Sequence, residues 1–214
     1  LILPYLNPTG FIVSSQNAIN DDIIAPIAGF NRAIGCVITL GAGMYKPGHA
    51  IRTSSRAGLA FKLGELNGRT TKRAQHLADM LSVIGPTQIT TNLWGERWAK
   101  LATNSMANPV AALTGLGSAE LRRTPGVVEV SIKICEEVVR VGSALGVEIE
   151  PISGIPAEDY ERADDAEMME ELQTRLLENT ITLGEGRPSM AQDVLKGRRT
   201  EIDYLNAYVA RRGK

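Results

Sequence analysis

One lysine and two asparagines form the pattern with the clearest chemical potential in this chain. Lys100, Asn104 and Asn108 follow one another at intervals of four residues, so on a helix they form one stripe that drifts by about 40° per step. Lys100 is the one charged residue between Trp98 and Ala119. Burial would lower the pKa of this lysine and make it a candidate acid, base or anion partner, while the amides could hold a polar substrate. The alternative is a lysine whose stem packs on the core while its ammonium reaches water, with asparagines that bond nearby backbone groups.

The element that must carry this stripe is a helix expected over residues 94–113. Its apolar residues recur at helical spacing and should form a buried face beside the stripe: Trp94, Trp98, Leu101, Ala102, Met106 and Leu113. A stripe bordered by such a face would be partly buried, and burial is the condition under which the pKa of a lysine is lowered.

Two further polar residues lie at the ends of predicted elements. On a helix begun by Thr200 and Asp203 at capping-box spacing, Glu201 borders the apolar face. A half-buried carboxylate there is a natural partner for a buried lysine, although a first-turn glutamate also complements the helix dipole. Asn17 follows a strand expected at residues 11–16, where open α/β sheets bind ligands, although such an asparagine also serves as an ordinary turn residue.

The pattern of apolar residues changes near Thr91-Asn92. Before this point, Thr70 or Thr71 caps one helix that ends at Gly85-Pro86, as is typical of α/β patterning. Strands are expected at residues 11–16, 33–40, 50–53, 60–66 and 88–91. We therefore expect an α/β part over residues 1–91 and an all-helical part over 92–214.

The helical part should contain several helices with recognisable ends. After the helix over 94–113, a second begins at Thr124-Pro125 and stops at Gly146, and a third spans Asp165–Ile181. Two more begin at capping-box spacings, Ser189 with Gln192 and Thr200 with Asp203.

Composition excludes several classes of function. The formal net charge is −1, from 23 basic and 24 acidic residues, which gives no electrostatic case for binding nucleic acid or a membrane surface. Cys36 and Cys135 lie in apolar runs and are expected to be buried thiols in a reducing compartment, and His49 and His76 lack companions at metal-ligand spacing. With no apolar run near the roughly 20 residues of a membrane span, a cytoplasmic protein without a metal site is expected.

The glycines do not form a phosphate-binding motif. Gly41-Ala42-Gly43 lacks a third glycine at the right spacing, and no helix is expected after it. No P-loop or G-x-S-x-G elbow occurs either. A dinucleotide fingerprint is therefore not part of this sequence.

Three segments jointly resemble one known family. They read SSQNA at 14–18, WAKLATNSMANP at 98–109 and SMAQDVLKGRRTEIDYLN at 189–206. Their order is similar to that of the ketopantoate reductase (2-dehydropantoate 2-reductase) family, and the resemblance covers essentially the whole chain. It implies an N-terminal Rossmann-type domain that binds NADP(H) and a helical C-terminal domain that binds a small 2-oxo acid. The first βαβ unit of that Rossmann-type domain would be absent here.

The resemblance also implies a role for each candidate residue. Lys100 would be the general acid that protonates the ketone oxygen, and Glu201 would bind the substrate hydroxyl and orient the lysine. Asn17 would lie where the nicotinamide meets the substrate. The substrate pocket would be lined by Asn104, Asn108 and Ser189.

Departures from the family pattern concern the substrate and the cofactor. Ala18 stands where a glycine is usual, Ser118 where an asparagine is frequent, and no amide precedes Ser189. A 2-oxo acid related to ketopantoate is therefore as plausible a substrate as ketopantoate itself. Without the glycine fingerprint, the chain alone is expected to bind a dinucleotide poorly and to be inactive.

Other assignments remain open from sequence. One is another two-domain 2-hydroxy acid or opine-type dehydrogenase, and another is a non-catalytic helical module for binding or dimerisation. The sequence also leaves open the oligomeric state, with a homodimer as one alternative, and the choice between NADP and NAD.

Overall fold

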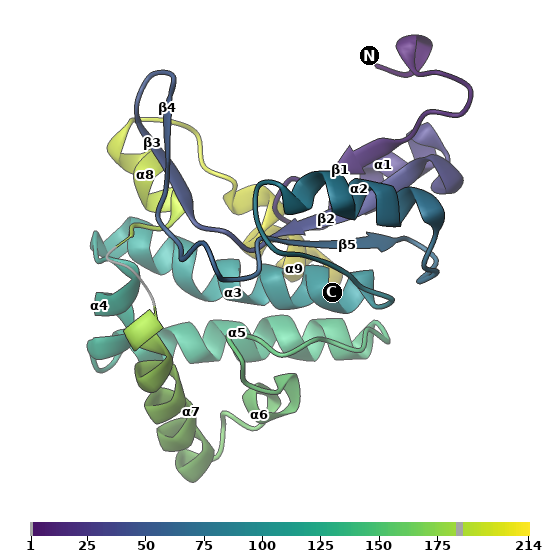
Figure 1. Ribbon diagram of the computed structural model, residues 1–214. Coiled ribbons are helices and arrows are strands. Elements are labelled where there is room, and N and C mark those ends of the chain that lie inside the picture. The colour runs from purple at the N-terminus through teal and green to yellow at the C-terminus, as the bar shows by residue number, and fades with distance from the viewer. Residues whose placement is uncertain (1, 183–185) are drawn as a thin grey trace. The chain divides into compact units, whose positions relative to one another are not determined.

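The computed structural model of the protein describes residues 2–182 and 186–214. Contacts divide the chain into two compact units (Figure 1). Unit 1 comprises Leu1–Leu40 and Ser55–Arg97, and unit 2 comprises Gly41–Ser54 and Trp98–Lys214. A mixed α/β segment is followed by a mainly helical one, which confirms the fold class expected from the sequence.

Unit 1 is built on a four-stranded sheet in the order β1-β2-β5-β6. The β1–β2 and β5–β6 pairs are parallel, whereas β2 and β5 are antiparallel. Each strand overlaps a predicted one, because short β-branched and apolar runs bounded by turn residues favour strands. Their bounds are β1 (Ile12–Ser14), β2 (Ala33–Ile38), β5 (Phe61–Glu65) and β6 (Thr87–Ile89).

The helices of unit 1 pack on this sheet. Helix α2 contacts β5 and β6, and the side chain of Thr71 caps it by accepting a bond from the Ala74 amide at 3.2 Å, as predicted. Helix α1 is missing from the sequence-based expectation, because Pro26 interrupts its helical pattern. The helical elements are η1 (Leu3–Tyr5), α1 (Asp21–Ala28), η2 (Phe30–Arg32) and α2 (Lys72–Ser82).

Unit 2 combines one hairpin with a set of helices. Strand β3 was not expected, because the glycines of residues 41–43 indicate a turn, yet it pairs with β4 in an antiparallel hairpin. The core of the unit lies between α3, α5, α7 and α9 and includes Leu101, Ile132, Leu172 and Leu205, all fully buried. The elements are β3 (Ala42–Lys46), β4 (His49–Arg52), α3 (Leu93–Thr114, shared with unit 1), α4 (Ser118–Arg123), α5 (Val127–Ala144), α6 (Ala157–Glu161), α7 (Ala166–Glu178), η3 (Asn179–Thr182), α8 (Ser189–Leu195), η4 (Ile202–Tyr204) and α9 (Asn206–Arg212).

The predicted start of the second helix is wrong. Helix α5 begins at Val127, after Gly126 with a φ of 75°. Thr124 instead ends α4, where its hydroxyl donates to the Glu120 carbonyl at 2.8 Å. The Thr124 hydroxyl thus bonds to α4, which it follows, and does not cap α5, because the turn at Gly126 lies between Thr124 and the first residue of α5.

The two predicted capping boxes near the C-terminus are also wrong. Pro188 is the N-cap of α8, so Ser189 is its first helical residue and not its cap. Thr200 and Asp203 do not begin a helix either, because residues 202–204 form the 3-10 turn η4 and α9 starts only at Asn206.

The first turn of α3 rests on two glycines of the sheet in unit 1. Leu93 lies over Gly35 of β2 and Gly64 of β5 and is almost completely buried. A Cβ atom at Gly35 would lie 2.5 Å from Cδ2 of Leu93. A Cβ atom at Gly64 would lie 2.9 Å from Cβ of Leu93 and 3.1 Å from the Thr90 carbonyl. The two glycines thus allow the helix that carries Lys100 to begin close against the sheet.

Alanine at Gly35 or at Gly64 should destabilise unit 1. Only the substitution at Gly35 should be compensated by a second substitution at Leu93. We expect Gly35→Ala and Gly64→Ala each to lower the free energy of unfolding by about 1–3 kcal/mol through overpacking. Leu93→Ala should then offset Gly35→Ala, because it removes the clashing Cδ atoms, but not Gly64→Ala, where Cβ and the Thr90 backbone remain. Urea unfolding of the two double-mutant cycles measures the difference.

Gly58→Ala is the matched control. Its Cβ atom would make only an ordinary contact of 3.6 Å, so a change of less than about 0.5 kcal/mol is expected. Equal rescue of both glycine substitutions by Leu93→Ala would contradict this account of the packing.

Candidate functional site

Helix α3 places the predicted stripe at the border of a buried face. Asn104 and Asn108 are 7% and 6% exposed, and Lys100 is partly buried. The Nδ2 atom of Asn104 is buried and has no hydrogen-bond partner in the part of the chain that the structure describes. An unsatisfied buried donor typically costs about 1–3 kcal/mol. A ligand oxygen would remove that cost, so Asn104 is a candidate binding residue.

The apolar face beside this stripe is largely as predicted. Trp98, Leu101, Ala102 and Met106 are buried. Burial lowers the pKa of the Lys100 ammonium below 10.5, because the charged form loses hydration. Among the described residues, no carboxylate reverses this shift. Lys100 is therefore a candidate proton donor, since a lowered pKa makes its ammonium a stronger acid than that of an ordinary surface lysine.

The structure brings Ser189 to the stripe. Nδ2 of Asn108 donates to Oγ of Ser189 at 3.5 Å, a long hydrogen bond that joins α3 to the first turn of α8. Two predicted site residues 81 positions apart are thus in contact. A serine hydroxyl and amides at this point offer polar groups to an anionic or carbonyl-bearing ligand.

Glu201 lies in a different local structure from the one expected. It precedes η4 and is partly buried, so the helical-wheel argument for its position is wrong. Its segment is held near α3 in another way: Nδ2 of Asn206 donates to the Ser105 carbonyl at 3.1 Å, and Leu205 is fully buried. The segment around Glu201 is therefore anchored to the helix that carries Lys100.

Asn17 belongs to unit 1, in the turn that follows β1. The side chain of Asn20 donates to its carbonyl oxygen. Its neighbour Ala18 has a φ of 68°, a left-handed conformation that costs a residue with a Cβ atom about 1–2 kcal/mol. Ala18 thus adopts the conformation that suits the glycine expected there from the resemblance.

The sequence does not predict the buried charges of unit 1, of which Arg97 makes the largest number of contacts. Arg97 is 3% exposed and forms an ion pair with Asp21, with Nε 2.7 Å from Oδ2. A helical arginine between Glu96 and Trp98 has no sequence signal that separates it from a surface charge.

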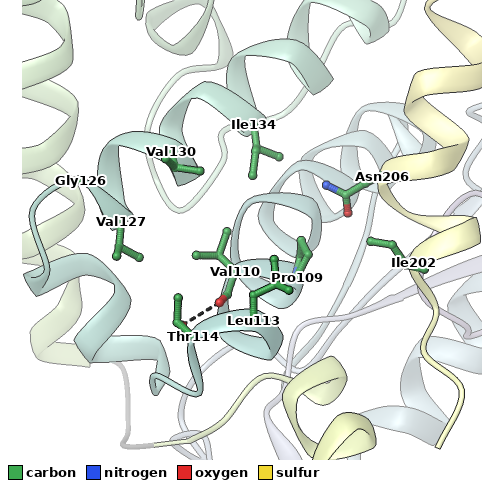
Figure 2. Close-up of a pocket in the computed structure, with 10 residues that line it drawn as sticks. All are labelled: Pro109, Val110, Leu113, Thr114, Gly126, Val127, Val130, Ile134, Ile202 and Asn206. Carbon is green, nitrogen blue, oxygen red and sulfur yellow. Dashed lines mark hydrogen bonds between the residues drawn. The ribbon is translucent and has the colours of Figure 1, made fainter.

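An apolar pocket in unit 2 is lined by residues that do not belong to the stripe (Figure 2). Its volume is about 380 Å³, and residues of α3, α5, η4 and α9 line it. Leu113 on its wall is 88% exposed, so its predicted place in the buried face is wrong: it lies near the end of α3 and borders this pocket. The lining side chains carry no titratable group, so the pocket does not offer acid–base chemistry.

The charges on α5 serve its packing. Glu136, 3% exposed, lies 3.0 Å from Lys133 and 2.6 Å from Arg140 on the same helix. Asp164 bonds the same two cations, and these hydrogen bonds lower its pKa to about 2. The four side chains form a closed set of ion pairs that joins α5 to the turn after α6. These charges therefore have a structural role.

Other kinds of site are not supported in the residues that the structure describes. Cys36 and Cys135 are free and buried, as predicted. No group of three or more His, Cys, Asp or Glu side chains suited to a metal ion occurs among residues 2–182 and 186–214. Within the same ranges, none of the helices has the length and apolar character needed to span a membrane.

Comparison with known sequences identifies relatives of this chain. The family described as "Ketopantoate reductase PanE/ApbA C terminal" matches residues 92–214. The 2-dehydropantoate 2-reductase of Archaeoglobus fulgidus is 26% identical over 207 residues, which cover 96% of this chain and 62% of that protein. The enzyme of the same name from Salmonella typhimurium is 33% identical over 141 residues, or 65% of this chain and 39% of that protein. The chain thus spans less than two thirds of the length of these relatives.

Solved structures show the same fold. A PanE/ApbA family ketopantoate reductase from Ralstonia eutropha JMP134 has a TM-score of 0.74 and 27% identity, over 99% of this chain and 62% of that one. D-mandelate dehydrogenase, solved as a ternary structure with NADH and anilino(oxo)acetate, has a TM-score of 0.79 and 22% identity, over 99% and 63%. The second likeness concerns the fold alone.

The lowered pKa of Lys100 predicts a pH-dependent effect of its removal. Between the lowered pKa and 10.5, the unfolded state binds more protons than the folded state, so the stability of the wild type rises with pH in that window. Lys100→Met should therefore stabilise the chain most below the lowered pKa, and the gain should shrink towards pH 10.5. Urea unfolding at a series of pH values measures this.

The exposed Lys72 provides the control for that series. Lys72→Met should show no comparable pH-dependent gain, because an exposed ammonium keeps its hydration. A stabilisation by Lys100→Met that does not change with pH would contradict the lowered pKa.

Proposed function

Because the chain belongs to the ketopantoate reductase family, we propose that the complete protein reduces the ketone of a 2-oxo acid with hydride from NADPH. The proposed substrate is 2-dehydropantoate or a close analogue, and the product is the corresponding 2-hydroxy acid. The observation that carries this proposal is Lys100, a partly buried lysine of lowered pKa on the helix that also presents Asn104 and Asn108.

Lys100 is the proposed general acid. As hydride adds to the carbonyl carbon, negative charge develops on the carbonyl oxygen and requires a cation and a proton in a site of low polarity. An ammonium whose pKa is already lowered by burial releases its proton more readily than an ordinary lysine. The proton moves from Nζ to the oxygen, which becomes the product hydroxyl.

The neighbouring polar groups are proposed to hold the substrate. The unsatisfied Nδ2 of Asn104 can donate to a substrate oxygen, and Ser189 with Asn108 can bind the carboxylate. Glu201 is proposed to accept a hydrogen bond from the substrate hydroxyl and to orient the lysine. These contacts would fix the ketone next to Nζ, and such positioning lowers the entropic part of the barrier.

The residues of this chain fit one end of a nicotinamide cofactor. Asn17 lies in the turn after β1, which pairs in parallel with β2, and ligands bind at the carboxyl ends of such strands. When bound, the nicotinamide supplies the hydride. Asn17 is proposed to hold that end of the cofactor.

The proposed domains follow the family rather than the compact units alone. We infer a remainder of the NADP-binding domain at residues 1–91 and a substrate domain at 92–214, where the family match begins. Contacts group the hairpin at residues 41–54 with the helices, so this segment is an insertion of the first part that packs with unit 2. The free thiols Cys36 and Cys135 are compatible with the proposed cytoplasmic location.

One contact favours a substrate other than 2-dehydropantoate. Ser118 stands where the resemblance expects an asparagine, and its hydroxyl donates to the Gly186 carbonyl at 2.9 Å. The hydroxyl is thus occupied by the segment just before α8 and does not offer the side-chain amide of an asparagine. A 2-oxo acid with a less polar side chain is the proposed alternative.

The direct test is turnover by the complete protein. It should be given NADPH with 2-dehydropantoate and with 2-oxo acids that carry linear, branched and aromatic side chains, while oxidation of the cofactor is followed by absorbance. Turnover of another 2-oxo acid but not of 2-dehydropantoate would support a related dehydrogenase. No oxidation with any 2-oxo acid would favour a non-catalytic helical module.

Replacement of Lys100 should abolish most of this activity. Lys100→Ala should lower kcat by about 10²–10⁴, the usual contribution of a general acid. Lys100→Arg should be nearly as inactive, because arginine keeps the charge but does not release a proton near neutral pH. Steady-state kinetics measure both, with the exposed Lys72→Ala as the control that should leave kcat unchanged. Wild-type kcat in Lys100→Arg would show that charge alone suffices.

Asn108 and Ser189 should act as a pair in substrate binding. Asn108→Ala and Ser189→Ala should each raise KM for the 2-oxo acid by about three- to tenfold, since each removes hydrogen bonds worth about 0.5–1.5 kcal/mol. Because the two side chains are hydrogen-bonded, the double variant should lose less than the product of the single effects. Fully multiplicative effects would contradict a shared role.

A further inference from the structure

The guanidinium group of Arg97 in unit 1 contacts partners that are far away in the sequence. Besides the ion pair at 2.7 Å, Nη2 of Arg97 donates to Oδ1 of Asp21 at 3.3 Å. Asp21 is fully buried and is the first residue of α1. A carboxylate in the first turn is also favoured by the helix dipole, so the pair is anchored at a fixed end of α1.

The remaining donors of Arg97 bind the end of β1 and the turn after it. Nη2 donates to the carbonyl and hydroxyl oxygens of Ser14 at 2.7 and 3.2 Å. Nη1 donates to the carbonyl of Gln16 at 2.9 Å and to that of Cys36 on β2 at 3.3 Å. Three main-chain oxygens, at the end of β1, in the turn after it and within β2, thus accept bonds from the guanidinium.

The turn between Ser14 and Asn20 needs such support, because its backbone is strained. Ala18 has a φ of 68° and is 6% exposed. Two side chains of unit 1 bind the carbonyls of the two residues before Ala18: Arg97 donates to the Gln16 carbonyl, and Asn20 donates to the Asn17 carbonyl. A strained conformation persists only where the surrounding contacts determine it.

We propose that Arg97 and Asp21 form a positioning clamp that holds the Ser14–Asn20 turn, and with it Asn17, in the conformation that receives the cofactor. The part of this inference that concerns the cofactor rests on the function proposed above. Arg97 is a positioning residue, since it acts through the turn. It also lies three residues before Lys100 on α3, so the helix that carries the proposed general acid carries the clamp as well.

The geometry requires arginine at this position. The guanidinium directs several donors in one plane, and here that plane meets a carboxylate and three main-chain oxygens. A lysine keeps the charge but has a single nitrogen on a flexible stem. Arg97→Lys should therefore retain a pairing with Asp21 and lose the hold on Ser14 and Gln16.

A paired substitution separates positioning from stability. Arg97→Leu alone would leave Asp21 buried without a partner and could unfold unit 1. The double variant Arg97→Met with Asp21→Asn removes both charges, keeps similar volumes and should fold cooperatively. Glu96→Gln is the matched control, because Glu96 is also buried on the first turns of α3 and forms its ion pair, at 2.6 Å, with Lys62 of β5.

The first measurement is amide hydrogen exchange of this chain. In the double variant and in Arg97→Lys, peptides that cover residues 15–20 should exchange at least tenfold faster than in the wild type, while β5 at Phe61–Glu65 keeps its protection. Glu96→Gln should leave residues 15–20 unchanged. Unchanged exchange in the double variant, or equal acceleration by Glu96→Gln, would overturn the clamp.

The second measurement is kinetic and uses the complete protein. The double variant should raise KM for NADPH about tenfold, with a smaller change in KM for the 2-oxo acid, while Glu96→Gln keeps both within about twofold. Equal changes in both KM values would show a general structural role and overturn the positioning of Asn17. If the wild type has no reductase activity, the proposed function fails, and the exchange experiment still decides whether Arg97 and Asp21 hold the turn.

Discussion

Large apolar side chains keep the polar stripe of α3 away from water, and the other helices of unit 2 are arranged around that constraint. Trp98 and Leu101 are nearly or fully buried beside Lys100. A Cβ atom at Gly142 of α5 would lie 2.8 Å from the Trp98 ring, so a glycine lets α5 approach this closely. The ring of Tyr208 on α9 lies 6.3 Å from that of Trp98. Helices α5 and α9 therefore shield the helix whose lysine has a lowered pKa.

Much of this fold follows from local rules, and its errors have a common cause. Periodicity and β-branched runs predict the strands of unit 1 and the long helices α3, α5 and α7. The first residues of helices are harder to predict, because a hydroxyl or carboxylate near a predicted start can instead bond to the preceding helix or to another element. Thr124 bonds back to α4, and Ser189 meets Asn108 on α3. Only the tertiary structure decides between these uses.

The residues of the candidate site also differ in how far the sequence predicts them. The stripe of Lys100, Asn104 and Asn108 is periodic and could be predicted from spacing. Glu201 was inferred from a helical wheel that the structure does not bear out, and Ser189 was suggested as a site residue by the family resemblance. Arg97 could not be predicted, because its partners Asp21 and Ser14 are 76 and 83 residues away. A charged residue on a helix is usually solvated, and burial of its whole guanidinium group depends on acceptors that only the folded unit assembles.

The two departures from the family pattern differ in kind. Ala18 keeps the left-handed backbone that a glycine would adopt easily, and hydrogen bonds to the carbonyls of the two preceding residues hold the turn there. The shape of that turn is thus preserved at the cost of local strain. Ser118, by contrast, directs its hydroxyl to Gly186 and supplies no amide, so the chemistry at that position is changed. Under the proposed function, the first departure would leave the turn at the proposed cofactor site in its shape, whereas the second would alter recognition of the 2-oxo acid, because a backbone conformation is kept in one case and a side-chain amide is lost in the other.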